Sequence, residues 1–406
     1  MAVEVPGSKS LTQRALIAAS LAQGKSLIRH ALIAEDTQHL MAGLKKLGAG
    51  IDPVAEGFEI TGTGGAITNQ CNELFLGNNG TALRFLTALS CLGRGRYVLT
   101  GEPRLCERPI GPLVSALQEM GVDIVCRNNC PPVKIMANGL RGGRITLADI
   151  ESSQYVSALL LCGPYTAKGI ELSLTGNIVS APYIDLTVRV MNDFGAKVLP
   201  TGNREYMVDT LHIYSGREYY IEGDASSASY FFLAALLLKK TIRVNGVSRE
   251  SAQGDIRLLD IMERLGCRVE SGKNFVQVSA GAPASGDMTL DMGDMPDMVP
   301  TVGVWAAFRK GRTLITNVAH LRIKESNRLA AMVTELNRIG ITASERSDGL
   351  LVEGGDAHPA SVETYNDHRI AMSFAVAGLV TPGMEIADKK CVDKSFPGFW
   401  KELAKI

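Results

Sequence analysis

Residues 110–121, Ile-Gly-Pro-Leu-Val-Ser-Ala-Leu-Gln-Glu-Met-Gly, have the pattern of an amphipathic helix that ends at a glycine. The same ending, followed by a strand-like segment, recurs at Gly48, Gly195, Gly266 and Gly340, so that successive glycines lie 73, 74, 71 and 74 residues apart. A glycine at this place adopts the left-handed conformation with which many helices end. The regular spacing predicts a fold made of repeated units.

A second, more apolar helix recurs with the same period. Its six copies include segments that begin at Arg14, Arg84, Tyr155, Tyr230, Val299 and Arg369. A helix that is apolar on all sides is buried, whereas the helices of the first set have one polar face. Six units, each with two helices and several short strands, therefore account for the chain. The alternative is an open doubly wound sheet of six ordinary βα units.

The repeats also predict the domain organisation. A chain of 406 residues is too long for one hydrophobic core. The sixth unit is cut short, because its second helix, 398–406, reaches the end of the sequence before any closing strand. We expect segment 2–6 to supply that strand, which gives domains of 8–222 and of 223–406 plus 1–7, with hinges near 7–8 and 222–223.

Composition excludes several classes of protein. Forty-two basic and 42 acidic residues give a formal net charge of zero, which argues against a surface for nucleic acid over the whole protein. No apolar run approaches the ~20 residues that cross a bilayer, and the first residues lack the pattern of a secretion signal. The eight cysteines have no metal-site spacing, so we interpret them as reduced thiols in a cytoplasmic protein.

Polar clusters recur just before the buried helices. They are Ser8-Lys9-Ser10, residues 77–81, Ser152-Ser153-Gln154, residues 224–227, residues 295–297 and Asn366-Asp367-His368, together with Ser180-Ala-Pro-Tyr183 before a helix of the first set. Such residues are also ordinary helix caps. If the helices of each domain are parallel, however, their positive ends point together at the cleft between the domains and favour anions there. Nearby Arg and Lys residues strengthen the prediction of a site for small, multiply charged anions.

Six segments of the chain resemble the signature segments of the 5-enolpyruvylshikimate-3-phosphate synthases. They are Pro6-Gly-Ser-Lys9-Ser10 with Arg14, Leu76-Gly-Asn78 with Gly80-Thr81-Ala82 and Arg84, Gly101-Glu-Pro with Glu107-Arg108-Pro-Ile110, Glu222-Gly-Asp-Ala-Ser-Ser227, Lys324-Glu325-Ser326 with Arg328, and Asn366-Asp-His-Arg369. They occur in the family's order and cover nearly the whole chain. The resemblance implies an α/β fold of two inside-out α/β barrel domains, each of three βαβαββ-type units, with the active site in the interdomain cleft.

The resemblance also implies the substrates and the residues that hold them. The first domain would mainly bind shikimate 3-phosphate, and the second would supply the acid and base and contacts to phosphoenolpyruvate. Shikimate 3-phosphate would contact Lys9, Ser10, Arg14, Ser152, Ser153, Gln154, Ser180, Tyr183, Asp297 and Lys324. Phosphoenolpyruvate would contact Lys9, Asn78, Gly80, Arg108, Gln154, Lys324, Arg328, Arg369 and Lys394. No metal or organic cofactor, nucleic acid or membrane is implied, the inhibitor would be glyphosate, and the protein would be a monomer whose domains close on the substrates.

The implied reaction needs an acid, a base and a cation. The expected catalytic residues are Lys9, Asp297, Glu325 and His368. Asp297 would orient and deprotonate the 5-hydroxyl, Glu325 would donate a proton to C3 of the enol, and Lys9 would stabilise charge at the reacting oxygens. The alternatives are that Asp297 only caps a helix, that Glu325 belongs to a solvated surface pair, and that His368 only orders its loop.

Four positions depart from the commonest family pattern. Asn79 stands where Ala is usual, Phe85 where Pro is common, Ala181 where Lys is frequent, and His320 where Asn is frequent. Asn79 and Phe85 flank the glycine against which glyphosate would pack. Gly80 itself is retained, so we expect glyphosate to bind, but less tightly than in relatives with Ala and Pro at these two positions.

Three other functions deserve comparison. A UDP-N-acetylglucosamine carboxyvinyltransferase would carry a reactive cysteine on a mobile loop, but Cys106 lies too close to Arg108 for that loop. A non-catalytic anion-binding protein on the same scaffold would have lost Asp297 or Glu325, and both are present. An enzyme that processes RNA ends would need a nucleophilic histidine and a basic surface, which the neutral composition does not suggest.

Overall fold

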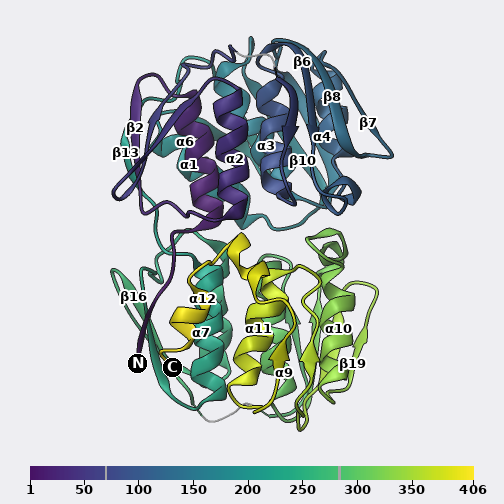
Figure 1. Cartoon of the computed structure of the whole chain (residues 1–406). Coiled ribbons are helices and arrows are strands. Elements are labelled where there is room, and N and C mark those ends of the chain that lie inside the picture. The colour runs from purple at the N-terminus through teal and green to yellow at the C-terminus, as the bar shows by residue number, and fades with distance from the viewer. Residues whose placement is uncertain (69–70, 282–284) are drawn as a thin grey trace. The chain divides into compact units, whose positions relative to one another are not determined.

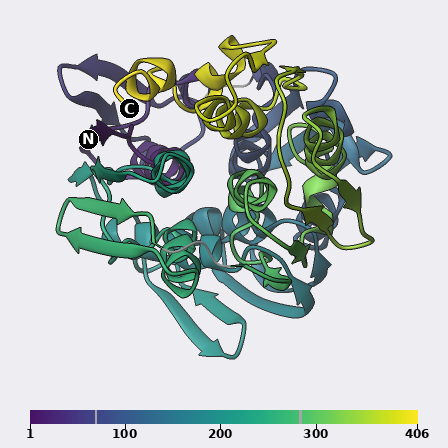
Figure 2. The same cartoon turned by 90° about the horizontal axis from the view of Figure 1, so that it is seen from below.

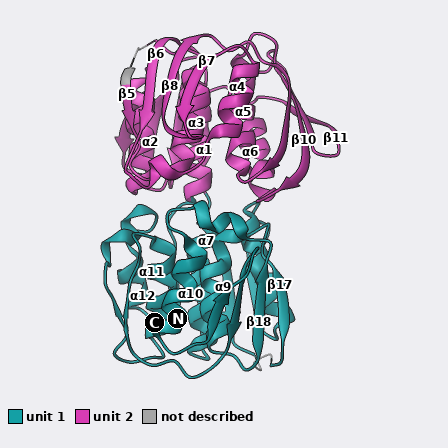
Figure 3. Ribbon diagram, turned by 90° about the vertical axis from the view of Figure 1, so that its right-hand side faces the viewer, with its two compact units in different colours: residues 1–8, 222–406 teal, residues 9–221 magenta. Residues whose placement is uncertain are grey.

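The chain divides into two compact units, which are coloured separately in Figure 3. Unit 1 comprises Met1–Ser8 and Glu222–Ile406, and unit 2 comprises Lys9–Ile221. The computed structural model describes residues 1–68, 71–281 and 285–406. The chain changes unit at residues 8–9 and 221–222, whereas the sequence placed these changes at 7–8 and 222–223.

The middle repeat of unit 2 shows the plan of a complete repeat. It runs β5 (Cys71–Phe75), α3 (Gly80–Ser90), β6 (Arg94–Thr100), α4 (Gly111–Glu119), β7 (Asp123–Arg127) and β8 (Cys130–Asn138). The strands form a sheet in the order β5-β6-β8-β7, in which β5 and β6 are parallel and the other neighbours are antiparallel. This is the βαβαββ order expected from the sequence. The separate four-stranded sheets exclude a single open doubly wound sheet.

The other two repeats of unit 2 have the same sheet order. One contains β9 (Gly143–Ile150), α5 (Ser153–Cys162), β10 (Ile170–Ile178), α6 (Pro182–Asp193), β11 (Val198–Gly202) and β12 (Glu205–Val208). The other begins with a helix and runs α1 (Lys9–Leu21), β2 (Lys25–Arg29), α2 (Glu35–Lys46), β3 (Gly50–Val54) and β4 (Gly57–Thr61). Its first strand comes from the far end of the unit, because β13 (Glu218–Tyr220) pairs in parallel with β2.

Unit 1 is built from three repeats of the same kind. The first contains β1 (Ala2–Glu4), α7 (Ala225–Leu237), β14 (Thr241–Asn245), α8 (Leu258–Arg264), β15 (Arg268–Gly272) and β16 (Phe275–Ser279). The second contains β17 (Met288–Asp291), α9 (Val299–Ala307), β18 (Arg312–Thr316), α10 (Arg328–Arg338), β19 (Ala343–Glu345) and β20 (Leu350–Glu353). The third is shorter, with β21 (Ser361–Val362), α11 (His368–Gly378), β22 (Glu385–Ile386) and α12 (Phe399–Leu403).

The N-terminal strand does not close the last repeat, so that prediction was wrong. Strand β1 pairs in parallel with β14, with Val3 opposite Val244, and so becomes the first strand of the sheet β1-β14-β16-β15. The physical reason is that the chain enters α7 almost directly after it changes unit, which leaves this repeat without a first strand of its own. Strand β1 still touches the C-terminal helix, because the Glu4 N–H donates to Oε2 of Glu402 at 2.9 Å.

The two sets of helices differ in burial as the sequence predicts. Helices α1, α3 and α5 of unit 2 and α7, α9 and α11 of unit 1 are buried along most of their length. The sheets lie outside them, since strands such as β8 alternate buried and exposed residues. Figure 1 labels α1, α3, α7, α9 and α11 among these helices, and Figure 2 views several helices of unit 1 along their axes. In each unit the buried helices therefore lie inside and the sheets lie outside.

Glycines end the other set of helices as expected. After α2, α4, α6, α8 and α10, the five predicted glycines have φ between 84° and 112°. No helix in the described part of the chain has the length and apolarity that crossing a bilayer requires. The seven cysteines whose side chains are described are free thiols, and the side chain of Cys71 lies outside the described part.

Candidate active site

A buried arginine, Arg328, joins three carboxylates in unit 1. It is the first residue of α10, and its side chain is wholly buried. Its Nε and Nη2 donate to the two carboxylate oxygens of Asp367 at 2.9 and 3.3 Å. Its Nη1 donates to Asp297 at 3.1 Å, and Nη2 donates to Glu325 at 2.7 Å. Burial by itself lowers the pKa of an arginine, but the three carboxylates outweigh it and raise the pKa of Arg328.

Both carboxylate oxygens of Asp297 accept hydrogen bonds from arginines. Arg328 donates to Oδ1 at 3.1 Å, and Arg369 donates to Oδ2 at 2.7 Å. Asp297 lies in the 3-10 turn Pro296–Met298 before α9 and makes no capping hydrogen bond to that helix, so the capping alternative is wrong. Burial alone would raise the pKa of this carboxyl, but Arg369, Lys324 and Arg328 outweigh it and hold the pKa of Asp297 well below its usual range.

Glu325 is not part of a solvated surface pair. Its side chain is 12% exposed, and the arginine that it contacts, Arg328, is 0% exposed. Its neighbour Ser326 is also buried and donates to Oδ2 of Asp367 at 2.9 Å. The loop that carries Glu325 is therefore held at two adjacent positions to the same buried cluster.

His368 begins α11 beside the cap of that helix. Asp367 caps α11 by accepting from the Arg369 N–H at 3.0 Å. The His368 side chain is 1% exposed, and its Nδ1 lies 4.0 Å from Oδ1 of Asp367. The structure thus places His368 in the buried part of the cluster, and whether it acts chemically or only orders the loop stays open.

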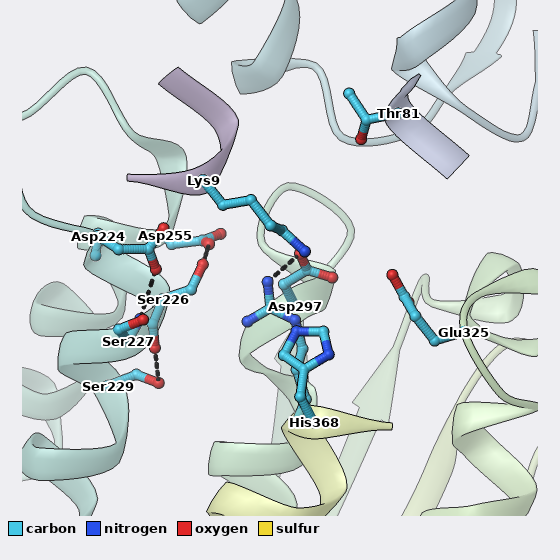
Figure 4. Close-up of polar contacts among 12 residues, drawn as sticks. Lys9, Thr81, Asp224, Ser226, Ser227, Ser229, Asp255, Asp297, Glu325 and His368 are labelled. Carbon is cyan, nitrogen blue, oxygen red and sulfur yellow. Dashed lines mark hydrogen bonds and ion pairs between the residues drawn. The ribbon is translucent and has the colours of Figure 1, made fainter. Parts of the chain in front are cut away.

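A second pair of carboxyls lies at the start of α7. Asp224 caps this helix by accepting from the Ser227 N–H at 2.7 Å, and Ser226 donates its hydroxyl to Oδ2 of Asp255 (Figure 4). Burial and then the charge of Asp297 raise the pKa of Asp255 to about 6. The pKa of Asp255 is thus raised while the pKa of Asp297 is lowered, a contrast that is common where protons are moved.

The remaining predicted cations of unit 1 lie on short turns. Lys324 follows the 3-10 turn Ala319–Ile323, and Lys394 ends the turn Lys390–Lys394, where it is 4% exposed. Burial and the charge of Lys324 lower the pKa of His320 to about 3, so this imidazole is neutral at neutral pH.

In unit 2, Lys9 forms the first turn of α1 and pairs with a carboxylate of α2. Its Nζ lies 3.1 Å from Oδ2 of Asp36. The side chains are 13% and 4% exposed, so the pair is shielded from most solvent. Asp36 belongs to the first turn of α2, where the helix dipole favours a negative charge.

Arg14 holds three helices of unit 2 together from within. It is 2% exposed, and its guanidinium donates to Thr187 and Ser157 side chains and to the carbonyls of Ser10 and Tyr183, at 2.7 to 3.4 Å. The rings of Phe85 and Tyr183 lie 5.5 and 5.9 Å from it. Burial lowers the pKa of Arg14 to about 10, so it remains charged at neutral pH. It thereby positions Tyr183, whereas its own contact with substrate stays a prediction.

The turn before α3 brings two arginines together. The carbonyl of Asn78 accepts from Arg108 at 3.2 Å, and the carbonyl of Gly80 accepts from Arg84 at 2.9 Å. Arg84 also donates to Oε1 of Gln154 at 3.3 Å, and Gln154 donates to the Thr81 hydroxyl at 3.0 Å. The predicted residues Asn78, Gly80, Arg108 and Gln154 therefore lie in one connected group.

The predicted serines of unit 2 lie at the starts of two more helices. Ser152 caps α5 by accepting from the Gln154 N–H at 3.3 Å, and Ser153 is buried beside it. Ser180 precedes α6 with φ 58°, a left-handed conformation that costs a serine free energy and is often found at functional sites.

The predicted residues share one structural setting. Most lie at or just before the first turn of a helix, in α1, α3, α5 and α6 of unit 2 and in α9, α10 and α11 of unit 1. Free N–H groups and the helix dipole favour anions there. In the part of the chain that the structure describes, no group of three His, Cys, Asp or Glu residues is arranged to hold a metal ion.

Sequence reasoning missed several members of these groups as site residues. Asp367 and Arg84 lay inside quoted motifs, so their positions among other site residues were a usable signal. Asp36 lay in no motif, and only the structure brings it to Lys9. Asn79 was noted as a departure, but its partners could not be read from the sequence.

The fold and these residues therefore define a class of α/β protein built from two units of repeated helices and sheets, with polar and charged side chains gathered at the helix starts. The family model of EPSP synthase (3-phosphoshikimate 1-carboxyvinyltransferase) matches residues 1–403. A 3-phosphoshikimate 1-carboxyvinyltransferase of Trichormus variabilis is 41% identical over 408 residues, covering 100% of this chain and 96% of the relative. One of Vibrio atlanticus is 40% identical over 408 residues, covering 99% and 95%.

The fold agrees with solved structures of the same kind. The EPSP synthase from Acinetobacter baumannii matches with a TM-score of 0.80 and 26% identity, over 100% of this chain and 95% of that chain. The chain belongs to the EPSP synthase family, and its activity is that of a 3-phosphoshikimate 1-carboxyvinyltransferase.

Proposed function

We propose that this chain transfers the carboxyvinyl group of phosphoenolpyruvate to the 5-hydroxyl of shikimate 3-phosphate and releases phosphate, using residues of both units. The observation that carries the assignment of roles is the Arg328 cluster, in which two cations suited to carboxylate and phosphate lie against a candidate base. Arg328 and Arg369 would bind the enol, together with Lys324 and Lys394 of unit 1 and Lys9, Asn78, Gly80, Arg108 and Gln154 of unit 2.

Shikimate 3-phosphate would be held mainly by unit 2. The proposed contacts are Lys9, Ser10, Arg14, Ser152, Ser153, Gln154, Ser180 and Tyr183, with Asp297 and Lys324 from unit 1. What supports this division is that the hydroxyls of unit 2 lie at the starts of α5 and α6, and the positive end of a helix favours an anion such as phosphate.

Binding of phosphoenolpyruvate would weaken the contacts of Asp297 with its two arginines and so prepare it to act as the base. Its two oxygens contact Arg328 and Arg369, both of which are proposed to bind phosphoenolpyruvate. Anionic groups of that substrate would compete for the same N–H donors. As they do so, the pKa of Asp297 rises from its depressed value and the carboxylate becomes a better acceptor for the proton of the 5-hydroxyl.

Glu325 would give a proton to C3 of the enol and later take one back. In the addition step the 5-oxygen bonds to C2 while Glu325 gives a proton to C3, and a tetrahedral intermediate forms. In the elimination step the bond from C2 to the phosphate oxygen breaks, the proton that Asp297 took from the 5-hydroxyl passes to the departing phosphate, and Glu325 takes a proton back from C3. Lys9, beside Asp36, would stabilise negative charge at the oxygens during both steps.

Phosphate release tests the proposal directly. Phosphate should appear only when shikimate 3-phosphate and phosphoenolpyruvate are both present. Asp297→Asn and Glu325→Gln should each lower kcat by at least ~10²-fold, with the dissociation constant for shikimate 3-phosphate largely kept. The exposed pair Arg144 and Glu171 offers a matched control, Glu171→Gln, which should retain turnover. Wild-type turnover in either site variant would remove that residue from the mechanism.

Three further properties belong to the proposal. Glyphosate should compete with phosphoenolpyruvate, because it is an anion that fits the same cations. The free thiols are compatible with a reducing cytoplasm. We also propose that the protein acts as a monomer, which sedimentation in the presence of both ligands would test.

A further inference from the structure

The side chain of Asn79 lies at a junction between three helices of unit 2. It is 1% exposed and caps α3, because its Oδ1 accepts from the Ala82 N–H at 2.9 Å. Its Nδ2 donates to Oε1 of Gln13 on α1 at 2.9 Å and to the carbonyl oxygen of Asp36 on α2 at 2.6 Å. Both polar atoms of the amide are used with consistent polarity, since the oxygen accepts from one donor and the nitrogen donates to two acceptors.

The neighbours of Asn79 connect this junction to the candidate anion site. The carbonyls of Asn78 and Gly80, on either side, accept from Arg108 and Arg84. On α2, Asp36 accepts from Asn79 through its backbone and contacts Lys9 through its side chain at 3.1 Å. The Asn79 amide is therefore connected to two parts of the candidate anion site. The neighbouring carbonyls of Asn78 and Gly80 accept hydrogen bonds from arginines, and its own partner Asp36 pairs with Lys9.

We propose that Asn79 is a positioning residue, whose amide holds the turn that binds Arg108 through the Asn78 carbonyl in register with the Asp36–Lys9 pair. A helix cap alone requires only the Oδ1 acceptor. The two bonds of Nδ2 serve a different purpose, because they run to other helices and leave no freedom for the turn to shift against α1 and α2. Buried hydrogen bonds in a connected group are costly to break singly, since each lost partner leaves a desolvated polar atom.

This inference rests on the proposed role of Lys9 and Arg108 toward phosphoenolpyruvate. If the turn and the Asp36–Lys9 pair lose their register, groups that contact the enol are displaced. Lys9 is shared with shikimate 3-phosphate, but the other proposed contacts of that substrate at the starts of α5 and α6 lie outside the hydrogen bonds of Asn79. Small displacements of positioned groups lower reactivity more than they lower binding of a substrate held elsewhere.

The test separates the positioning role from the capping role. Asn79→Ser keeps an oxygen that caps α3 but has no amide to reach Gln13 or Asp36, whereas Asn79→Ala removes both functions. We expect Asn79→Ser to lower the melting temperature less than Asn79→Ala does, because it keeps the cap of α3, and to lower kcat/KM for phosphoenolpyruvate by about tenfold. The dissociation constant for shikimate 3-phosphate, measured by calorimetry without the enol, should change by less than about threefold.

A partner variant supplies the control. Gln13→Met removes the acceptor on α1 and should lower kcat/KM by about threefold, and Asn79→Ser with Gln13→Met should be no worse than Asn79→Ser alone, because both break the same bond. Additive losses would overturn the inference, as would wild-type kinetics in Asn79→Ser.

Lys9→Met tests the proposed role of Lys9 separately from the positioning role of Asn79. It should abolish turnover, and wild-type turnover in that variant would overturn the proposed role of Lys9 together with the inference.

Discussion

Gly80 is the residue at which substrate and inhibitor should be told apart. A Cβ at this position would lie 2.3 Å from Nη1 of Arg84 and 2.5 Å from Cζ and Nη2 of Arg108. Such contacts are too short to persist, so both guanidinium groups would have to move. Because Arg108 is a proposed ligand of phosphoenolpyruvate, any added side chain affects the enol as well as glyphosate.

Gly80→Ala should therefore raise the KM for phosphoenolpyruvate and raise the inhibition constant of glyphosate more strongly. Glyphosate is the longer molecule, so it tolerates the added methyl group and the displaced Arg108 less well. A difference of ~1.4 kcal/mol between the two penalties would appear as a tenfold change in selectivity. Steady-state kinetics with and without glyphosate measures both quantities. Equal losses would show that the pocket does not discriminate by length at this position.

Only some of the residues at the site could be predicted from the sequence. Arg328, Asp297 and Glu325 stood in motifs, and the structure brings them into contact. Asp36 and Gln13 carry no such signal, because their roles depend on which side chains meet across helices far apart in the sequence. Asn79 shows the same limit, since the sequence marks it as a departure from the commonest family pattern, but its partners on α1 and α2 follow only from packing.

Among the elements, helices were predictable and one strand was misplaced. Hydrophobic period and terminal glycines located both sets of helices, since these are local properties of the chain. Strand pairing is not local, and the alternating pattern of segment 2–6 predicted a strand without saying which sheet it joins. The structure pairs β1 with β14, as β13 pairs with β2 in unit 2. In both cases a strand remote in sequence completes a repeat that begins with a helix.

This pairing makes the first residues of the chain part of the core of unit 1. Val3 is 1% exposed and belongs to the core cluster that also includes Val244 and Val276. Val3→Ala should lower the free energy of unfolding by about 2 kcal/mol, because it removes two buried methyl groups and leaves a cavity. Urea denaturation followed by circular dichroism measures the loss. The control is Ala2→Ser at an exposed position of the same strand, with an expected change within about 0.5 kcal/mol. A stable Val3→Ala protein would contradict the pairing of β1 inside the core.

At the scale of the whole molecule, the residues proposed to bind the substrates are divided between the two units. The cations proposed for phosphoenolpyruvate come from both, with Arg108 in unit 2 and Arg328 and Arg369 in unit 1. The repeats predicted this division of the chain, because their count and spacing are properties of the sequence alone. The division of labour between the units is a chemical proposal and needs its own measurement.

Hydrogen exchange with the full chain provides that measurement. Ligands that contact residues of both units should slow amide exchange at the starts of α5 and α6 in unit 2 and at residues 324–328 and 366–369 in unit 1. Shikimate 3-phosphate alone should protect mainly the segments of unit 2, since most of its proposed contacts are there. Addition of glyphosate should extend protection to the segments of unit 1, because its anionic groups would bind Arg328 and Arg369 in place of Asp297. Protection confined to unit 2 in the presence of both ligands would contradict the proposal that Arg328 and Arg369 bind the enol, and the release of Asp297 by substrate would have to be abandoned with it.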